Sequence, residues 1–200
     1  IVNEKLYIAD VDELVEVDIA TEKIIKKHKG IGAVCFNDVT HDKYGNVYVG
    51  DTYTDSIYRT NQFGQLPLWL YSANLAPNGI HIDNESGTMI VGSWGSVMEG
   101  WGTPEKAGNL KSIDLNSKKV KNLGSDKPIG NLDGVEAAGK NSYYVTDWSS
   151  GKLYDIKKNG RFEELKTLGK GAADHEVIME KKLILVPVMT EGKVVALKID

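Results

Sequence analysis

Short runs of alternating apolar and polar residues, separated by turns rich in Asp, Asn and Gly, make up most of the chain. The clearest example spans residues 37–51, where an alternating run ends at His41, a turn follows at Asp42 and Gly45, and residues 47–49 read Val-Tyr-Val. Valine, threonine and tyrosine favour pleated strands, and Asp and Gly favour the tight turn between them. The pattern predicts a β-hairpin.

This hairpin unit recurs along the chain. Units begin at Asn37, Asn78, Asp133 and Asp174, so successive starts lie 41, 55 and 41 residues apart. Each unit also contains a third β-rich run, and most contain a fourth. A repeat of about 40–45 residues with four short strands is typical of β-propeller blades. We therefore expect an all-β fold with about five blades of four antiparallel strands and little helix.

The two ends of the chain differ from this pattern. Residues 5–18 correspond to the second half of a hairpin unit, and the last unit ends after its third run. The interpretation is a single β-propeller domain over residues 1–200 that is incomplete at its N-terminus.

Composition narrows the possible partners. The chain is 41% hydrophobic and 26% charged, with a net charge of −4 and no run of Lys or Arg longer than two residues. A surface that binds nucleic acid usually carries a basic patch, so this composition argues against nucleic acid as a partner. No apolar run approaches the roughly 18–20 residues that cross a bilayer, which argues against membrane insertion. The single cysteine, Cys35, excludes an intrachain disulfide.

The residues that start the four units share a chemistry. If the innermost strands of a propeller line its central channel, Asn37, Asn78, Asp133 and Asp174 converge at one mouth, where each offers an oxygen donor. Oxygen donors suit Ca²⁺ or another hard divalent cation. The alternative is that Asn-Gly and Asp-Gly pairs recur only because every blade turns in the same way.

Other polar and aromatic residues receive structural interpretations. His81 alternates to the opposite face of its strand and is interpreted as a packing or surface histidine. His41 and His175 lie close to candidate ring positions, from which either could reach substrate, but a structural role is favoured for both. The aspartates at the hairpin corners are interpreted as caps of the following turn: Asp10, Asp51 and Asp147. Residues 92–108 form a Gly- and Trp-rich insertion, either a loop that shapes a binding site or a self-packed excursion.

The order of these motifs resembles that of a known family. Asn37-Asp38-Val39 with a downstream Gly45, then residues 77–80 (Pro-Asn-Gly-Ile), then residues 132–135 (Leu-Asp-Gly-Val), are similar to motifs of the SMP-30/gluconolactonase/LRE-like family. The resemblance covers about residues 5–200. It implies a six-bladed β-propeller that holds a divalent cation, usually Ca²⁺, on its axis, in a periplasmic or secreted setting.

The resemblance also implies roles for individual residues. Asn78 looks like a metal ligand, Asp133 like a ligand that doubles as catalytic base, and Asn37 like the asparagine that contacts metal or substrate. Asp174 has no counterpart in the family motifs and is assigned to substrate binding, while the family's glutamate ligand has no counterpart here. The implied function is divalent-metal-dependent hydrolysis of lactones or related esters. The alternative is a non-catalytic, NHL-like propeller that binds a protein or small-molecule ligand.

Overall fold

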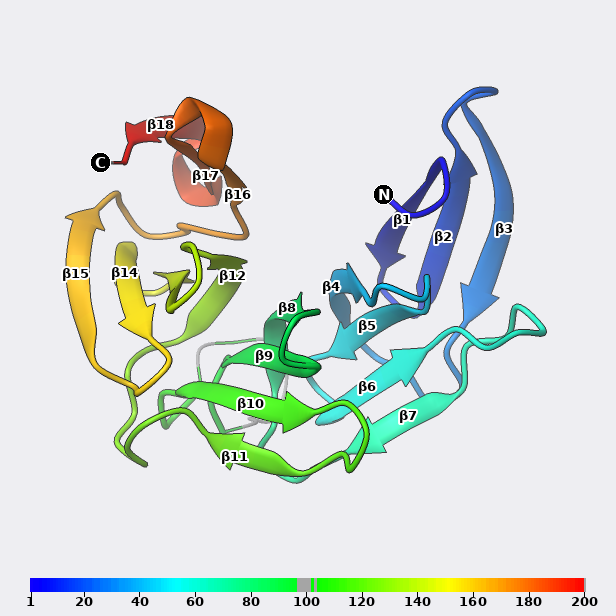
Figure 1. Cartoon of the computed structure of the whole chain (residues 1–200), viewed down its shortest axis with the longest axis horizontal. Helices are drawn as coiled ribbons and strands as arrows, with labels where there is room; N and C mark the ends of the chain where they lie inside the picture. Colours follow the sequence, from blue (N-terminus) through cyan, green and yellow to red (C-terminus); the bar gives the residue numbers. More distant parts are fainter. Residues whose placement is uncertain (97–101, 103, 200) are drawn as a thin grey trace.

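The computed structural model describes residues 1–96, 102 and 104–199, and these form five antiparallel sheets arranged as the blades of a β-propeller (Figure 1). Blades 2, 3 and 4 have four strands, and blades 1 and 5 have three. The strands are, for blade 1, β1 (Lys5–Asp10), β2 (Glu13–Asp18) and β3 (Lys23–Lys29); for blade 2, β4 (Phe36–His41), β5 (Val47–Asp51), β6 (Ser56–Arg59) and β7 (Leu68–Tyr71); for blade 3, β8 (Pro77–Asp83), β9 (Thr88–Ser93), β10 (Leu110–Asp114) and β11 (Val120–Asn122); for blade 4, β12 (Leu132–Ala137), β13 (Ser142–Asp147), β14 (Lys152–Lys157) and β15 (Phe162–Thr167); for blade 5, β16 (Glu176–Ile178), β17 (Leu183–Val188) and β18 (Lys193–Lys198).

The predicted fold class is confirmed. Within the described residues the only helical elements are two 3-10 turns, η1 (Met179–Lys181) and η2 (Met189–Glu191). Blade 1 corresponds to strands two to four of a full blade and blade 5 to strands one to three, as the repeat pattern predicts. Blades 1 and 5 lie apart from each other at the two ends of the arc (Figure 1). No described helix has the length and apolar character needed to span a membrane.

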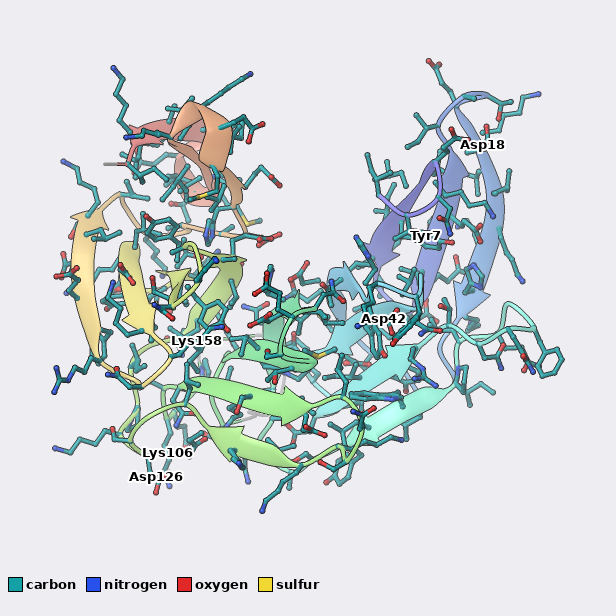
Figure 2. All side chains as sticks on the ribbon, in the orientation of Figure 1. Tyr7, Asp18, Asp42, Lys106, Asp126 and Lys158 are labelled. Carbon is teal, nitrogen blue, oxygen red and sulfur yellow. The ribbon has the colours of Figure 1, made fainter. Side chains whose placement is uncertain are left out.

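The turn that the sequence places between β4 and β5 is held by Asp42. Its carboxylate accepts hydrogen bonds from the backbone N–H groups of Tyr44 (2.9 Å) and Asn46 (3.0 Å) and from the Tyr48 hydroxyl (3.2 Å). Gly45 has φ of 82°, which a residue with a side chain rarely adopts. Figure 2 shows Asp42 in this position beside the start of β5.

The core consists of apolar clusters between adjacent blades. In blade 2, Val47 and Val49 point towards blade 1 and pack with Leu14 of β2. The equivalent pairs in the next blades also pack against the preceding blade: Met89 and Val91, Tyr143 and Val145, Ile184 and Val186. Each blade therefore buries the second strand of the next one, which fixes the spacing of the innermost strands around the channel.

The corner aspartates of blades 2 and 4 have the capping role that the sequence predicts. Asp51 accepts hydrogen bonds from the backbone N–H groups of Tyr53 (3.2 Å) and Thr54 (3.3 Å) in the turn that follows it. It also accepts from the N–H groups of Val34 (2.7 Å) and Cys35 (3.1 Å), in the segment that enters blade 2. Asp147 accepts one from the N–H of Asn131 (3.3 Å) and another from the Ser150 hydroxyl (2.7 Å). These bonds tie the start of the innermost strand to the end of the second strand in the same blade.

Candidate functional site

The four unit-starting residues line one cavity of about 490 Å³ at the end of the channel. Asn37 comes from β4, Asn78 from β8, Asp133 from β12, and Asp174 from the segment just before β16. The structure thus brings together all four residues that the sequence proposes for the site. Part of the 92–108 insertion also contributes, because Trp94 and Gly102 line the same cavity. Residues 97–101 and 103 of the insertion lie outside the described residues.

A β-bulge at the same place in three innermost strands positions these side chains. The pairing register shifts between Phe36 and Val39 in β4, between Pro77 and Gly79 in β8, and between Leu132 and Val135 in β12. Asn37, Asn78 and Asp133 lie within these three bulges. A bulge locally breaks the alternation of a strand and re-aims its side chains, and here it coincides with the cavity.

The glycines that follow Asn78 and Asp133 allow the innermost strands to approach closely. A Cβ atom at Gly79 would collide with the carbonyl oxygen of Asp133, and a Cβ atom at Gly134 would lie 2.8 Å from Asp174 Oδ1. Both glycines lie within strands and neither lies in a turn. The turn-forming interpretation of these Asx-Gly pairs is therefore wrong, since the glycines serve contact between blades.

Asn78 is buried and only partly hydrogen-bonded. Its Nδ2 donates to the carbonyl oxygen of Leu132 and to Asp133 Oδ2, both at 3.1 Å. Its Oδ1 has no hydrogen-bond partner among the described residues. Buried polar atoms in folded proteins almost always have a partner, so this oxygen is suited to a donor or a cation from outside the chain.

The two site carboxyl groups sit in an environment that opposes ionisation. Burial, and then the charge of Asp174, raises the pKa of Asp133 to about 7, against the hydrogen bond from Asn78. Burial, and then the charge of Glu136, raises the pKa of Asp174 to about 6. Two buried acids with such values can exchange protons near neutral pH, and a bound cation would favour their ionised forms.

Three further residues around the channel were not predicted as part of the site. Asp38 accepts hydrogen bonds from the backbone N–H of Val39 (2.6 Å) and of Ile80 (2.7 Å), and burial together with Asp174 raises its pKa well above the usual range. The distance between Glu136 Oε2 and His81 Nδ1 is 3.2 Å, so His81 has a partner in the channel wall. His175 is buried, and burial lowers its pKa to about 4.

One wall of the cavity is aromatic. The rings of Trp94 and Trp148 meet edge to face with centroids 5.9 Å apart, and Lys170 Nζ lies 5.4 Å from the centre of the Trp148 ring. Trp94 Nε1 also donates to the carbonyl oxygen of Gly102 (3.2 Å), which holds the described part of the insertion over the cavity. This part of the lining therefore combines an apolar surface with the positive charge of Lys170, in the same cavity as the amides and carboxyl groups.

The donor set fits a hard cation better than a transition metal. Over residues 1–96, 102 and 104–199, no three His, Cys, Asp or Glu side chains gather in a way that could hold a metal ion. The cavity is lined by two carboxamides, from Asn37 and Asn78, and two carboxyl groups, from Asp133 and Asp174. Asn78 Oδ1 has no hydrogen-bond partner among the described residues. Such oxygen donors suit Ca²⁺, with water or substrate completing its six to eight ligands.

Comparisons with known proteins agree on the architecture. No protein-family model matches the sequence, and no curated protein matches it either. A chain of a nidogen/laminin complex superposes with a TM-score of 0.80 at 13% identity, covering 98% of this chain and 72% of that one. The chain is a β-propeller. The narrower resemblance to the SMP-30/gluconolactonase family is not established by these comparisons and stays a prediction.

Other solved propellers are similar but have different functions. Kuenenia stuttgartiensis hydrazine synthase matches with a TM-score of 0.69 at 16% identity, over 98% of this chain and 62% of that one. Virginiamycin B lyase from Staphylococcus aureus matches with a TM-score of 0.58 at 16% identity, over 98% and 67%. Identities this low indicate a shared fold, and one fold hosts many functions.

Proposed function

We propose that the cavity is the active site of a divalent-cation-dependent hydrolase that acts on lactones or related esters. The observation that carries the proposal is the buried Asn78 Oδ1, which lacks a partner and belongs to a side chain that also contacts Asp133. The motif resemblance to SMP-30/gluconolactonase proteins supports the same conclusion.

In this proposal, Asn37, Asn78 and Asp133 hold the cation, with Ca²⁺ as the expected ion. When bound, such an ion supplies Lewis-acid polarisation of an ester carbonyl. Asp133 has a carboxyl pKa in the range suited to a general base. It takes a proton from the attacking water, and that proton then passes to the ester oxygen that leaves. Asn37 and Asp174 bind substrate within the same cavity.

The aromatic wall supports a second candidate function. A stacking surface and a positive charge come from Trp94, Trp148 and Lys170. These features can bind a ligand even if the site catalyses no reaction. The alternative is therefore a non-catalytic propeller, similar to NHL-type repeats, that binds a small molecule or a protein at this mouth.

The test combines calcium titration by calorimetry with hydrolysis assays on a panel of lactones and aryl esters. The hydrolase proposal expects Ca²⁺ binding and calcium-dependent turnover in the natural protein. Asn78→Ala should weaken calcium binding, because one ligand is lost. Asp133→Asn keeps the size of the side chain and should lower kcat by at least about a hundredfold, which is the usual contribution of a positioned general base.

A matched variant keeps the outcome interpretable. Asp155→Asn changes a carboxylate on β14 that does not line the cavity, so turnover should stay at the natural level. Calcium binding without turnover on the whole panel would favour the binding function. Turnover that survives both calcium removal and Asp133→Asn would refute the assignment of this site.

A further inference from the structure

A second set of equivalent residues lines the same cavity as the unit-starting residues. In blades 2 to 5, one residue directly follows the last residue of the second strand, β5, β9, β13 or β17. All four of these residues line the cavity, and we call them the corner ring: Thr52, Trp94, Trp148 and Met189. The cavity therefore has one ring of oxygen donors and a second ring that is apolar on blades 3, 4 and 5.

One backbone hydrogen bond fixes each residue of the corner ring. The N–H of Trp94 donates to the carbonyl oxygen of Ala76 (2.9 Å), and the N–H of Trp148 donates to that of Asn131 (3.0 Å). Each acceptor belongs to the segment that leads into the innermost strand of the same blade. The equivalent bonds of the other two members are Thr52 to Cys35 (3.1 Å) and Met189 to Gly171 (2.8 Å). The corner ring therefore keeps a fixed position beside the polar site residues.

The two tryptophans of the corner ring form one surface across blades 3 and 4. Their rings meet edge to face, with centroids 5.9 Å apart. The Asn131 side chain strengthens the link, because its Nδ2 donates to the carbonyl oxygen of Trp94 (2.8 Å). Both Trp94 and Trp148 are half-buried, so part of each ring stays accessible. Aromatic side chains held in this way suit an aromatic group of a ligand.

Lys170 adds a positive charge to this surface. It is the only Lys or Arg among the described residues that line the cavity, and its Nζ lies 5.4 Å from the centre of the Trp148 ring. No ion pair in the described part of the chain includes Lys170, although Asp133 and Asp174 line the same cavity. Seven other lysines do form ion pairs: Lys5, Lys27, Lys29, Lys152, Lys157, Lys158 and Lys193. The ammonium group of Lys170 is therefore available to a ligand.

The backbone on both sides of Lys170 is fixed at the cavity. Gly169 and Gly171 have φ of 119° and 88°, which a residue with a side chain rarely adopts. The N–H of Gly171 donates to the carbonyl oxygen of Trp148 (2.7 Å), and the Thr190 hydroxyl donates to the carbonyl oxygen of Lys170. A Cβ atom at Gly171 would lie 2.8 Å from the backbone nitrogen of Thr190. These contacts keep the Lys170 side chain next to the Trp148 ring.

We propose that the corner ring and Lys170 select a ligand in which a carboxylate is attached to an aromatic ring. The aromatic ring packs against Trp94 and Trp148, and the carboxylate accepts a charge-assisted hydrogen bond from Lys170 Nζ. A ligand cation is disfavoured, because the positive charge beside the Trp148 ring is already that of Lys170. A cavity of about 490 Å³ has room for such a molecule.

This ligand class deepens the proposed function and rests on it for the reaction itself. The substrate of the hydrolase is then a lactone or ester that carries an aromatic ring and a second, unreactive carboxylate. Recognition of the carboxylate by Lys170 needs neither calcium nor turnover, so it can be measured separately.

The test is isothermal titration calorimetry in calcium-free buffer with three probes of similar shape: naphthylacetate, its neutral amide naphthylacetamide, and the cation naphthylmethylammonium. Without calcium, the carboxylate cannot bind through a metal ion. The natural protein should bind naphthylacetate roughly fivefold or more tightly than the amide, as a charge-assisted hydrogen bond predicts, and should bind the cation most weakly. Lys170→Gln should abolish the preference for the carboxylate, and Lys170→Arg should retain it. Trp148→Leu should weaken the binding of acetate and amide alike.

Lys166→Gln is the matched control. Lys166 is exposed on β15 and does not line the cavity, so its replacement should change the affinity for naphthylacetate less than twofold. The proposal is overturned if neither naphthylacetate nor its amide binds, if the two bind equally, or if the cation binds more tightly. Equal effects of Lys170→Gln and Lys166→Gln would also overturn it, since the preference would then reflect only the overall charge.

Ester hydrolysis assays keep this inference apart from the proposed function. A protein that hydrolyses no ester but prefers naphthylacetate through Lys170 supports the ligand class and contradicts the hydrolase. Conversely, calcium-dependent hydrolysis of neutral esters without any preference for the carboxylate supports the hydrolase and overturns the ligand class.

Discussion

Replacement of His175 by leucine should reduce the acid sensitivity of the fold. His175 is 5% exposed, and neither ring nitrogen has a hydrogen-bond partner among the described residues. Burial lowers its pKa from 6.5 to about 4, although Glu136 acts in the opposite direction. A histidine whose pKa is depressed by folding stabilises the protein fully above the unfolded value. That contribution is lost as the pH falls towards the folded value.

The size of the effect follows from these two pKa values. One pKa unit corresponds to about 1.4 kcal/mol. At pH 5 the unfolded histidine is almost fully protonated and the folded one mostly neutral, so the free energy of unfolding is lower by about 2 kcal/mol than at pH 7.5. His175→Leu removes this component and also removes two unpartnered polar atoms from the core.

The assay is urea unfolding at pH 7.5 and pH 5.0, followed by tryptophan fluorescence. The difference in free energy of unfolding between the two pH values should be about 2 kcal/mol smaller in His175→Leu than in the natural protein. Asp133 and Asp174 titrate in the same range, but they are present in both proteins, so their contribution largely cancels in the comparison. His41→Gln is the control, because His41 lies on the surface and its replacement should leave the difference unchanged. If His175→Leu keeps the full acid sensitivity, the buried imidazole is not its source.

Three further predictions concern the blade contacts and the site. Gly79→Ala places a methyl group against the carbonyl oxygen of Asp133, so thermal and urea unfolding should show a loss of about 3 kcal/mol or more. Gly139→Ala meets no neighbour and should lose only about 1–2 kcal/mol from its positive φ. Asp51→Ala leaves four backbone N–H groups without their acceptor, those of Val34, Cys35, Tyr53 and Thr54, and should lower the free energy of unfolding by about 2–3 kcal/mol. Asp10 is the exposed residue at the equivalent corner of blade 1, so an equal effect of Asp10→Ala would contradict this account. Calcium should raise the Tm of the natural protein and have little effect on Asp133→Asn, and an identical shift in both would place the ion elsewhere.

The repeat made much of the architecture predictable. Alternation and turn residues are local properties, so they located the hairpins and aligned Asn37, Asn78, Asp133 and Asp174 at equivalent places. Convergence of these residues then follows from blade geometry, because equivalent positions in every blade face the same channel.

The remaining features depend on contacts between blades, which local patterns do not encode. Asp38 reaches the N–H of Ile80 because β4 is bulged, and strict alternation takes no account of a bulge. The raised pKa values of Asp133 and Asp174 come from burial by residues distant in sequence. Likewise, position 79 requires glycine because it contacts Asp133 on β12, which is distant in sequence, and the residues around Gly79 do not indicate that contact.

The pairwise packing of the blades has a consequence for how the chain loses its structure. Leu14, Ile57, Leu110 and Leu153 hold equivalent positions and are almost fully buried by the following blade, whereas Val194 in blade 5 is 67% exposed. Cooperativity in such an array is passed from neighbour to neighbour. Loss of one of these contacts should therefore first loosen the two blades that share it, and amide exchange should rise in those two blades before it rises in the others.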